Sequence, residues 1–494
     1  MIQVLVQSTK RLAAALAFAA AGVATAPVAQ AQMQNDRPQF VDDRAFLDEW
    51  QRRCFNFFWE QTNPATGMTA DRAPADGSKL TYAGEEPAGS VASVGFGLTA
   101  LAIADERGWV ETEAAQQRAE VTLRFLLEKA QHKEGFFYHF INMTTGQRIW
   151  NCEVSSVDTA LLLAGVLTVR QYYAGHETIP ELATAIYDRV NWPWMMSDGR
   201  TLSMGWTPEE GFITWRWDHF SEHLVLQMLG LGSNTHPLPQ HTWHNWKRGP
   251  VYTNENTGER FMSFPPLFVH QFSHAWVDFR GKRDDYADYW TNSVFATRAH
   301  RDMFSSPQLT DRFPHYSNML WGITSSDSAN GYTAWGGPDP SPHIDGTIVP
   351  CAAAGSIPFK PDECIAAVRH MYDVYGDKLW KHYGLADAFN PATGWVANDV
   401  IGIDVGITML MIENHRSGFV WRQFMANPEI NRAMLTAGFR PLPPEAAGQE
   451  AAVALFFDGD GPTYAFAADG GESVDGVAGE ASDASVDPSE PVSE

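Results

Sequence analysis

Apolar side chains recur with helical spacing along most of the chain. Segments in which they return every three or four positions predict α-helices, and these segments are residues 46–61, 92–109, 112–131, 155–173, 218–232, 285–304, 362–376, 402–416 and 419–435. Strand-like alternation is scarce, and the loops are rich in Gly, Pro and Trp. Because no sharp linker interrupts the pattern, we expect one all-α domain over residues 40–442.

Three strongly apolar helices are predicted to begin with a carboxylate. Ser155 or Ser156 is a good N-cap and places Asp158 in the first turn of its helix, while Glu222 and Asp404 open two others. A carboxylate at a helix start interacts with the unsatisfied N–H groups there, which is worth about 0.3–1 kcal/mol. This capping role explains each residue singly. Strongly apolar helices are typical inner elements of a bundle or ring, however, and their carboxylates would then converge on one mouth.

Charge and the N-terminal pattern narrow the class of protein. The formal net charge is −24, which disfavours nucleic acid as a partner. Lys10 and Arg11 precede an apolar run and an Ala-x-Ala site ending at Ala31, so residues 1–31 have the pattern of a secretory signal peptide cleaved after Ala31. The run is shorter than the ~20 residues of a spanning helix. We therefore expect a periplasmic or secreted protein without a membrane span, present as a monomer or weak dimer.

The C-terminal segment, residues 443–494, differs in composition from the rest of the chain. It holds twelve Asp or Glu and no Lys or Arg, and it has too little apolar content to order itself. We expect a disordered, low-complexity acidic tail. The four cysteines are too few for a disulfide scaffold at this length, although export permits a bridge between Cys351 and Cys364.

Seven segments follow one another in an informative order: EVSSVDTALLLAG, FSEHLVLQMLGLGSNTHPLP, PPLFVHQFSHAWVDFRGKRDDYADYWTNSVFATRAHR, WGITSSDSANGY, DGTIVPCAAAGSIPF, YGLADAFN and IGIDVGITMLMIENHRSGFVW. Together they resemble the glucoamylase-like domain of bacterial β-1,2-glucanases, over residues 46–439. The resemblance implies an (α/α)6 toroid, in which six outer helices surround six inner ones. It also implies hydrolysis of linear β-1,2-glucan, by inverting endo-enzymes or by enzymes that release sophorose, with no cofactor and no catalytic metal.

Three positions depart from the family pattern. Asn234 stands where the family has Pro, Ser325 where it has Ala, and Val405 where it has Gln. These positions fall in loops expected to form sugar subsites. The departures therefore leave the exact linkage open while they preserve the prediction of a hydrolase.

Glycoside hydrolysis requires one protonated carboxyl for the leaving oxygen and one carboxylate that activates water or attacks carbon. Asp218 and Glu222 are four residues apart and would share a helix face, where their repulsion would keep one protonated. Glu222 is the predicted general acid. Asp158 and Asp404 have no acidic neighbour at helical spacing, so we expect both to stay ionised and either to be the base. Glu153 is a further catalytic candidate, with capping or bridging as the alternative role.

Trp is abundant, and its indole can stack on a pyranose ring while its N–H donates to a hydroxyl. Some loop Trp residues are therefore expected to line a sugar groove, although core packing is the alternative for each. The predicted substrate-binding residues are Arg216, Trp217, His236, Gln271, His274, Trp321, Asp327 and Tyr332.

A metal site is the alternative interpretation of HQFSHAWVD, in which His270, His274 and Asp278 lie on one helix face. The segment lacks the glutamate of H-E-x-x-H, so core or sugar-contacting histidines are favoured and no metal is predicted. At the level of function, an exo-type enzyme that releases sophorose is the main alternative to endo-hydrolysis. A non-catalytic glucan-binding protein and an exo-α-glucosidase remain as further alternatives.

Overall fold

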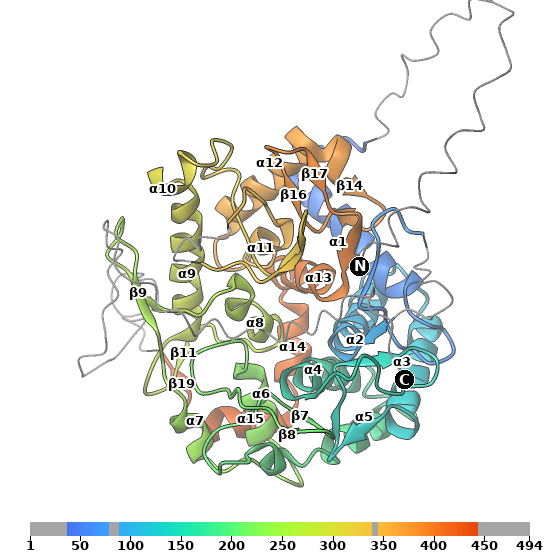
Figure 1. The fold of residues 1–494 in the computed structure, drawn as a ribbon. Coiled ribbons are helices and arrows are strands. Elements are labelled where there is room, and N and C mark those ends of the chain that lie inside the picture. The colour runs from blue at the N-terminus through green and yellow to red at the C-terminus, as the bar shows by residue number, and fades with distance from the viewer. Residues whose placement is uncertain (1–36, 79–87, 338–343, 443–494) are drawn as a thin grey trace, which may run out of the picture. The chain divides into compact units, whose positions relative to one another are not determined.

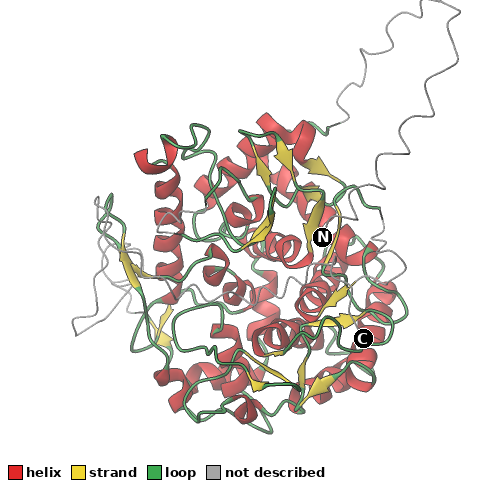
Figure 2. Ribbon diagram, in the orientation of Figure 1, coloured by secondary structure: helices red, strands yellow, loops and turns green. Residues whose placement is uncertain are grey.

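The computed structural model describes residues 37–78, 88–337 and 344–442, and the elements belong to one compact unit that begins at Gln39. Helices dominate it, as Figure 2 shows. The longer helices are α1 (Asp43–Glu60), α2 (Val91–Glu106), α3 (Thr112–Glu128), α4 (Ser156–Tyr172), α5 (Ile179–Asp188), α6 (Leu224–Leu231), α9 (Tyr289–Phe304), α12 (Pro361–Leu379), α13 (Gly402–Arg416) and α15 (Pro428–Thr436). The shorter ones are α7 (His241–Asn245), α8 (Phe272–Trp276), α10 (Pro307–Thr310), α11 (Pro350–Ala354), α14 (Phe419–Met425) and two 3-10 helices, η1 (Trp192–Met195) and η2 (Leu267–His270).

Six helices pack in a closed cycle. Helix α2 packs against α4, α4 against α6 and α6 against α8, while α11 packs against α13 and α13 against α2 (Figure 1). The Gln271 side chain closes the remaining step between α8 and α11, because it donates to Ala352 O and Ser356 Oγ, both at 2.8 Å. Helices α1, α3, α5, α15 and α12 cover this cycle from outside. The all-α prediction is confirmed, and the cycle matches the inner ring of the expected (α/α)6 toroid.

Glycines set how closely the inner helices approach. A Cβ at Gly165 of α4 would lie 2.0 Å from Gly95 O of α2, and one at Gly95 would lie 2.2 Å from Leu161 O. On the other side of α2, a Cβ at Gly406 of α13 would lie 2.4 Å from the Phe96 ring. No side chain fits at such distances. Helices α2 and α4 therefore pack backbone to backbone inside the ring.

Short strands hold the N-terminal ends of the inner helices together. β2 (Ala88–Ser90), β6 (Val154–Ser155) and β18 (Asp399–Ile401) run directly into α2, α4 and α13. β18 pairs with β1 (Arg72–Pro74), and Asp71, which precedes β1, donates its N–H to Ala88 O and accepts from Gly402 N at 2.6 Å. One end of the ring is thus built around the segment at Asp71.

The remaining strands form two- and three-residue ladders in the connections. They are β3 (His132–Lys133) with β4 (Phe136–Phe137), β5 (Phe140–Asn142) with β2, β7 (Gly205–Thr207) with β6 and β8 (Gly211–Phe212), β9 (Val251–Thr253) with β10 (Arg260–Met262), β11 (Lys282–Arg283) with β19 (Arg440–Pro441), β12 (Ser326–Ser328) with β13 (Gly331–Thr333), β14 (Trp380–Lys381) with β15 (Gly384–Leu385), and β16 (Phe389–Asn390) with β17 (Trp395–Val396). Sequence patterning misses them because two or three residues are too few to show alternation.

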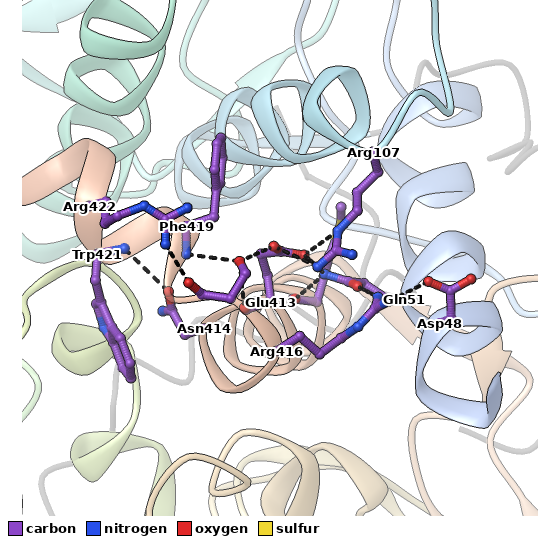
Figure 3. A network of polar contacts seen from close by, with 11 residues as sticks. Asp48, Gln51, Arg107, Glu413, Asn414, Arg416, Phe419, Trp421 and Arg422 are labelled. Carbon is purple, nitrogen blue, oxygen red and sulfur yellow. Dashed lines mark hydrogen bonds and ion pairs between the residues drawn. The ribbon is translucent and has the colours of Figure 1, made fainter. Parts of the chain in front are cut away.

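A polar network ties the opposite, C-terminal end of α13 to its neighbours (Figure 3). The buried Glu413 carboxylate accepts from Arg107 at the end of α2, from Gln51 Nε2 of α1 at 2.8 Å, and from Ser417 Oγ at 2.5 Å. Arg416 extends the network outward to Gln51 Oε1. Each buried oxygen of Glu413 thus has a donor, so three helices meet at one carboxylate.

Predicted helix boundaries agree with the structure to within about three residues, with three exceptions. Helix α9 begins at Tyr289, four residues after the predicted start at residue 285. The segment 218–232 is helical only over Leu224–Leu231, because residues 218–223 turn sharply before the helix. The segment 419–435 divides into α14 and α15 at Asn427, which precedes a Pro that starts the second helix.

Cys351 and Cys364 are free thiols, so the bridge considered between them is absent. The predicted signal peptide, residues 1–31, and acidic tail, residues 443–494, lie outside the described residues. In the described part of the chain, every helix is too short or too polar to cross a membrane.

Candidate active site

Carboxylates gather around His139 at the N-terminal end of α4. His139 Nδ1 lies 3.0 Å from Glu153 Oε1, and its Nε2 lies 3.7 Å from Asp158 Oδ1. Ser155 is the N-cap of α4, and its hydroxyl also donates to Asp158 Oδ2 at 2.5 Å. Burial lowers the pKa of His139, but the charges of Asp158, Glu153 and Asp71 outweigh it and raise that pKa to about 9. His139 is therefore a cation held between two carboxylates.

Glu222 lies next to this cluster with a proton at neutral pH. Burial and the charge of Asp158 raise the pKa of Glu222 to about 7, against an opposing hydrogen bond from Ser221 Oγ. The turn that presents Glu222 is fixed by Ser273 of α8, whose hydroxyl donates to Glu222 O and accepts from Val225 N. A carboxyl so placed has the protonation state of a general acid.

The reason predicted for this raised pKa was wrong. Asp218 does not share a helix face with Glu222, because α6 begins only at Leu224 and Asp218 is exposed beside His219. Glu222 also does not open the helix as a first-turn residue, since His223 is the N-cap and makes no side-chain cap bond. The proton on Glu222 follows from its burial and from Asp158, which belongs to another helix.

Asp404 lies in the first turn of α13 as predicted, but its environment differs from the prediction. The side chains of Asp404 and Asp387 are in hydrogen-bonding contact, and both residues are buried. Burial raises the pKa of both carboxyls, the charge of Asp327 adds to this at Asp387, and Asp387 adds to it at Asp404, so the pair does not carry two charges at neutral pH. The expectation of an ionised Asp404 without an acidic neighbour was wrong, because Asp387 comes from the β15–β16 connection and has no helical spacing to Asp404.

An ion pair borders the second carboxyl cluster, which consists of Asp404 and Asp387. Arg72 of β1 places Nη1 3.1 Å from both carboxylate oxygens of Asp327 on β12, and the backbone N–H of Asp327 donates to Asp387 Oδ2 at 3.1 Å. Tyr332 pairs directly across from Asp327, and burial and the charges of Asp404, Asp71 and Asp387 raise the pKa of its hydroxyl. Asp71 therefore acts on His139 and on Tyr332, so its charge lies between the two clusters.

Exposed aromatic side chains are confined to this end of the ring. Among the Phe, Tyr and Trp residues in the described segments, those with highly exposed side chains are Trp150, Trp215 and Tyr332, at 46%, 47% and 41%. Trp150 shortly precedes Glu153 and has a positive φ of 56°, an uncommon conformation for a non-glycine residue. Its ring packs against Phe140, which stacks on His139. Trp215 accepts a backbone bond from Met204, beside β6 and β7.

Two predicted sugar contacts support the loops near this end instead of facing solvent. Arg216 is bound to Asp198 at 2.6 Å and to Thr201 Oγ1 at 2.9 Å. Trp217 is buried, and its indole N–H donates to Ser156 Oγ at 2.8 Å. Both side chains therefore have internal partners, and their neighbour Trp215 faces solvent.

Four further residues that were predicted to contact sugar are not brought to the carboxyl groups. Gln271 bridges α8 and α11 inside the ring, and Trp321 is fully buried. His274 is buried against Ser293 Oγ at 3.1 Å, and burial lowers its pKa to about 3. His236 follows the C-terminal end of α6, so the length of that helix separates it from Glu222. The structure brings Asp327 and Tyr332 to the carboxylates, but not these four.

Two groups of residues contain possible metal ligands. The predicted helix face does not form, because His270 ends η2 and Asp278 lies beyond the end of α8. His270 is held by Ser263 at 3.0 Å and is buried and neutral, and Asp278 is paired with Arg280. His139, Glu153 and Asp158 offer ligand atoms within 4.8 Å of one another. With its pKa raised to about 9, His139 pairs as a cation with both carboxylates.

An open recess of about 890 Å³ lies elsewhere among the described residues. Asp105, Glu120, Tyr172 and His176 line it at the C-terminal ends of α2 and α4, and it is wide open to solvent. The carboxyl clusters are the better candidate site, because they combine a protonated acid, further carboxyl groups and exposed aromatic rings at one end of the ring.

Sequence patterning missed three residues of the site: Arg72, His139 and Asp387. Arg72 and His139 lie outside the quoted segments, and only the fold brings them to Asp327 and Asp158. Asp387 lies within YGLADAFN, so a signal was present. Its contact with Asp404 joins positions 17 apart in sequence through a strand connection, which periodicity does not reveal.

Comparisons with known proteins agree with this arrangement. Residues 214–428 match the family model Glycoamylase, described as "Putative glucoamylase". An endo-β-1,2-glucanase from Chitinophaga pinensis, solved with sophorotriose and glucose, is 27% identical, with a TM-score of 0.75 over 81% of this chain and 99% of that one. A structure from Bacteroides fragilis NCTC 9343 titled as a putative glucoamylase is 30% identical, with a TM-score of 0.73 over 82% of this chain and 99% of that one.

A curated relative from Parabacteroides distasonis carries a different activity name. This exo β-1,2-glucooligosaccharide sophorohydrolase (non-reducing end) is 28% identical over 431 residues. The match covers 80% of this chain but only 58% of the relative's length. The similar proteins therefore include both an endo-acting and an exo-acting enzyme on β-1,2-linked glucose.

Proposed function

Because the chain belongs to the glucoamylase-like family of glycoside hydrolases that includes bacterial β-1,2-glucanases, we propose that it hydrolyses linear β-1,2-glucan to sophoro-oligosaccharides, by endo-action and with inversion at the anomeric carbon. The observation that carries the proposal is the Glu222 carboxyl, whose pKa is raised to about 7, beside Asp158 at the end of the ring that also holds Asp404 and exposed aromatic rings. Glycoside hydrolysis needs this combination of an acid and a proton acceptor.

Glu222 is the proposed general acid. It donates its proton to the glycosidic oxygen as the bond to the anomeric carbon breaks, which avoids the release of an alkoxide. The buried position that holds the proton at neutral pH also gives a low-dielectric path to the substrate. The negative charge of Asp158 nearby stabilises positive charge that develops on the sugar ring.

Asp404 is the proposed proton acceptor. In the inverting reaction a water attacks the anomeric carbon from the face opposite the leaving group and loses a proton to a base. A base is most effective when its pKa lies near the working pH, which burial and Asp387 favour for Asp404. Asp158 is less suited, since Ser155 and His139 already engage its oxygens. Glu153 is proposed to orient His139.

Aromatic residues are proposed to bind the sugar chain. Trp150, Trp215 and Tyr332 present exposed rings next to the carboxyl groups, and indole and phenol rings stack on the C–H faces of pyranoses. Asp327 and Arg72 add polar contacts at the Tyr332 side. Arg216 and Trp217 act by supporting the loop of Trp215.

Incubation with linear β-1,2-glucan, β-1,3-glucan and starch, followed by chromatography, tests the activity. We expect β-1,2-glucan alone to be cut, with and without a chelator. Long intermediates early in the time course indicate endo-action, whereas sophorose as the first product supports the exo-type alternative favoured by the Parabacteroides distasonis relative. Glucan binding without cleavage indicates a non-catalytic glucan-binding protein, and cleavage of starch alone indicates an α-glucosidase.

Export is part of the proposal and rests on the signal pattern of residues 1–31. N-terminal sequencing of periplasmic material is expected to begin after Ala31. The monomer or weak dimer expected in solution stays a prediction that sedimentation velocity tests.

A further inference from the structure

Asp387 is a buried carboxyl without a basic side chain in hydrogen-bonding contact among the described residues. It is 5% exposed and lies in the connection between β15 and β16. Its Oδ2 accepts the backbone N–H of Asp327, and its side chain contacts that of Asp404. Asp387 Oδ1 and Asp404 Oδ2 receive no hydrogen bond from the protein groups that the structure describes.

The groups around this pair do not neutralise two charges. Arg72 faces Asp387 from β1, but its guanidinium is already bound to Asp327 and paired with Asp71. From α11, the buried Cys351 thiol donates to Asp404, and burial and the two carboxyls raise the pKa of that thiol. The opposite side is apolar, with Leu385 and Val400 lining a cavity of about 20 Å³ together with the two carboxyls.

Two other titratable side chains line the same cavity and have partners elsewhere. Cys54 donates to Tyr383 O, and the Tyr383 hydroxyl is bound to Gln61 and Glu60. Tyr332 faces the pair from β13 and remains a neutral phenol. No cation other than Arg72 is therefore directed at the pair from these elements.

Two buried carboxyls in contact cannot both ionise, because the repulsion of like charges adds to the cost of burial. The two carboxyls can form a hydrogen bond only when one of them is protonated and donates that proton to the other. The two groups then titrate as one unit with one proton and one negative charge, as carboxyl pairs do in other hydrolases.

We propose that Asp387 is a positioning residue that shares a proton with Asp404 and thereby makes Asp404 a base suited to near-neutral pH. The inference rests on the proposed function, in which Asp404 accepts the proton of the attacking water. In that step the C1–O bond to water forms, the water proton passes to Asp404, and the pair changes from one negative charge to neutral. Glu222 meanwhile gives its proton to the leaving oxygen. After the reaction the pair releases one proton to solvent and Glu222 takes one proton up, so both groups return to their starting states.

The variant Asp387→Asn tests this role. The new side chain keeps the shape, accepts the Asp327 N–H and donates an N–H to Asp404, but an amide N–H is a weaker donor than a carboxylic O–H. Because the base must be ionised, kcat rises with pH as the pair loses its first proton, and the weaker hydrogen bond to the Asp404 anion moves this acid limb to higher pH, by about one unit. Asp387→Glu, which restores a carboxyl, is expected to return the limb toward the wild-type position.

Asp288→Asn is the matched control. Asp288 is also a buried carboxyl, but it caps α9, where Asn serves equally well. Its pH profile is expected to coincide with that of the wild type. An acid limb that stays in place in a folded Asp387→Asn protein, or that moves equally in Asp288→Asn, overturns the proposal.

Infrared spectroscopy gives a readout that does not need turnover. Besides the band of Glu222, the wild type is expected to show a second protonated-carboxyl band at pH 6 to 7 that is lost in Asp387→Asn and also in Asp404→Asn. If no glucan is cleaved but the band behaves in this way, the proposed function fails and the shared proton stands. If the wild type cleaves β-1,2-glucan but neither variant alters the band, the shared proton is overturned and the proposed function stands.

Discussion

Arg107 and Glu413 form a two-pronged ion pair at the end of α13 opposite Asp404, with Arg107 Nη2 2.8 Å from Glu413 Oε1 and Nε 3.0 Å from Oε2. Glu413 is 1% exposed, so the pair fixes α2 to α13 in a place that water does not screen. The catalytic end of α13 is thereby aligned by a contact nine residues along the helix from Asp404, about 14 Å away at the ~1.5 Å rise per residue of a helix.

We expect Glu413→Gln to lower the free energy of unfolding by about 3 kcal/mol, because it leaves the Arg107 charge without its counter-ion. Urea denaturation measures the change. Glu120→Gln is the matched control, since Glu120 pairs with Arg124 on the exposed face of α3, and such pairs contribute less than about 1 kcal/mol. Equal losses in the two variants would show that the buried position of Glu413 has no special effect.

Gly165→Ala is expected to separate α2 from α4. A methyl group at residue 165 would lie 2.0 Å from the backbone oxygen of Gly95, and backbone cannot rotate away as a side chain can. Overpacking of this kind costs about 1–3 kcal/mol. Gly175→Ala, where no atom lies within 4 Å of the new Cβ, is the control and is expected to leave the thermal midpoint unchanged.

The helices were largely predictable from sequence and their catalytic surroundings were not. Periodicity and the Ser155 cap are local properties, so α4 and the first-turn positions of Asp158 and Asp404 followed from them. The proton on Glu222 was predicted for the wrong reason, because its acidic neighbour is Asp158 on another helix. Asp387 was missed because its effect on Asp404 requires the fold to bury both. Long-range pairing of charges is the part that spacing along the chain does not encode.

A basic limb near pH 7 is expected in the kcat profile, set by Glu222. The general acid must be protonated, and its pKa is raised to about 7, so activity is lost as the pH rises through that value. Glu222→Gln is expected to lower kcat by several orders of magnitude while the circular dichroism spectrum stays unchanged. A folded Glu222→Gln enzyme with near-wild-type turnover, or a basic limb unrelated to pH 7, would assign the acid role to another group.

Trp150→Ala and Trp215→Ala are expected to raise KM for long glucans more than for short oligosaccharides. Each substitution removes one exposed stacking face, which is worth about 0.5–1.5 kcal/mol beyond burial. Leu435→Ala, which removes an exposed apolar side chain on α15, is the control. A KM that is unchanged for every chain length in both Trp variants would place the sugar chain elsewhere.

Asp158→Asn separates the capping role of Asp158 from an electrostatic one. Asn is as good a partner for the start of α4, so a pure capping role predicts a stability change of at most ~1 kcal/mol and unchanged turnover. We expect instead a folded protein whose kcat falls by several orders of magnitude, because the charge of Asp158 acts mainly in the transition state.

The same variant is expected to lower the pKa of His139, now raised to about 9, which ¹H–¹⁵N NMR of the imidazole measures. Because the carboxylates raise the pKa of His139 in the folded state, they also stabilise the fold. This stability is fully present below the unfolded pKa of His139 of about 6.5 and is lost as the pH rises through 9. In Asp158→Asn this loss should therefore be complete at lower pH. Wild-type turnover together with an unshifted His139 would return Asp158 to a capping role alone.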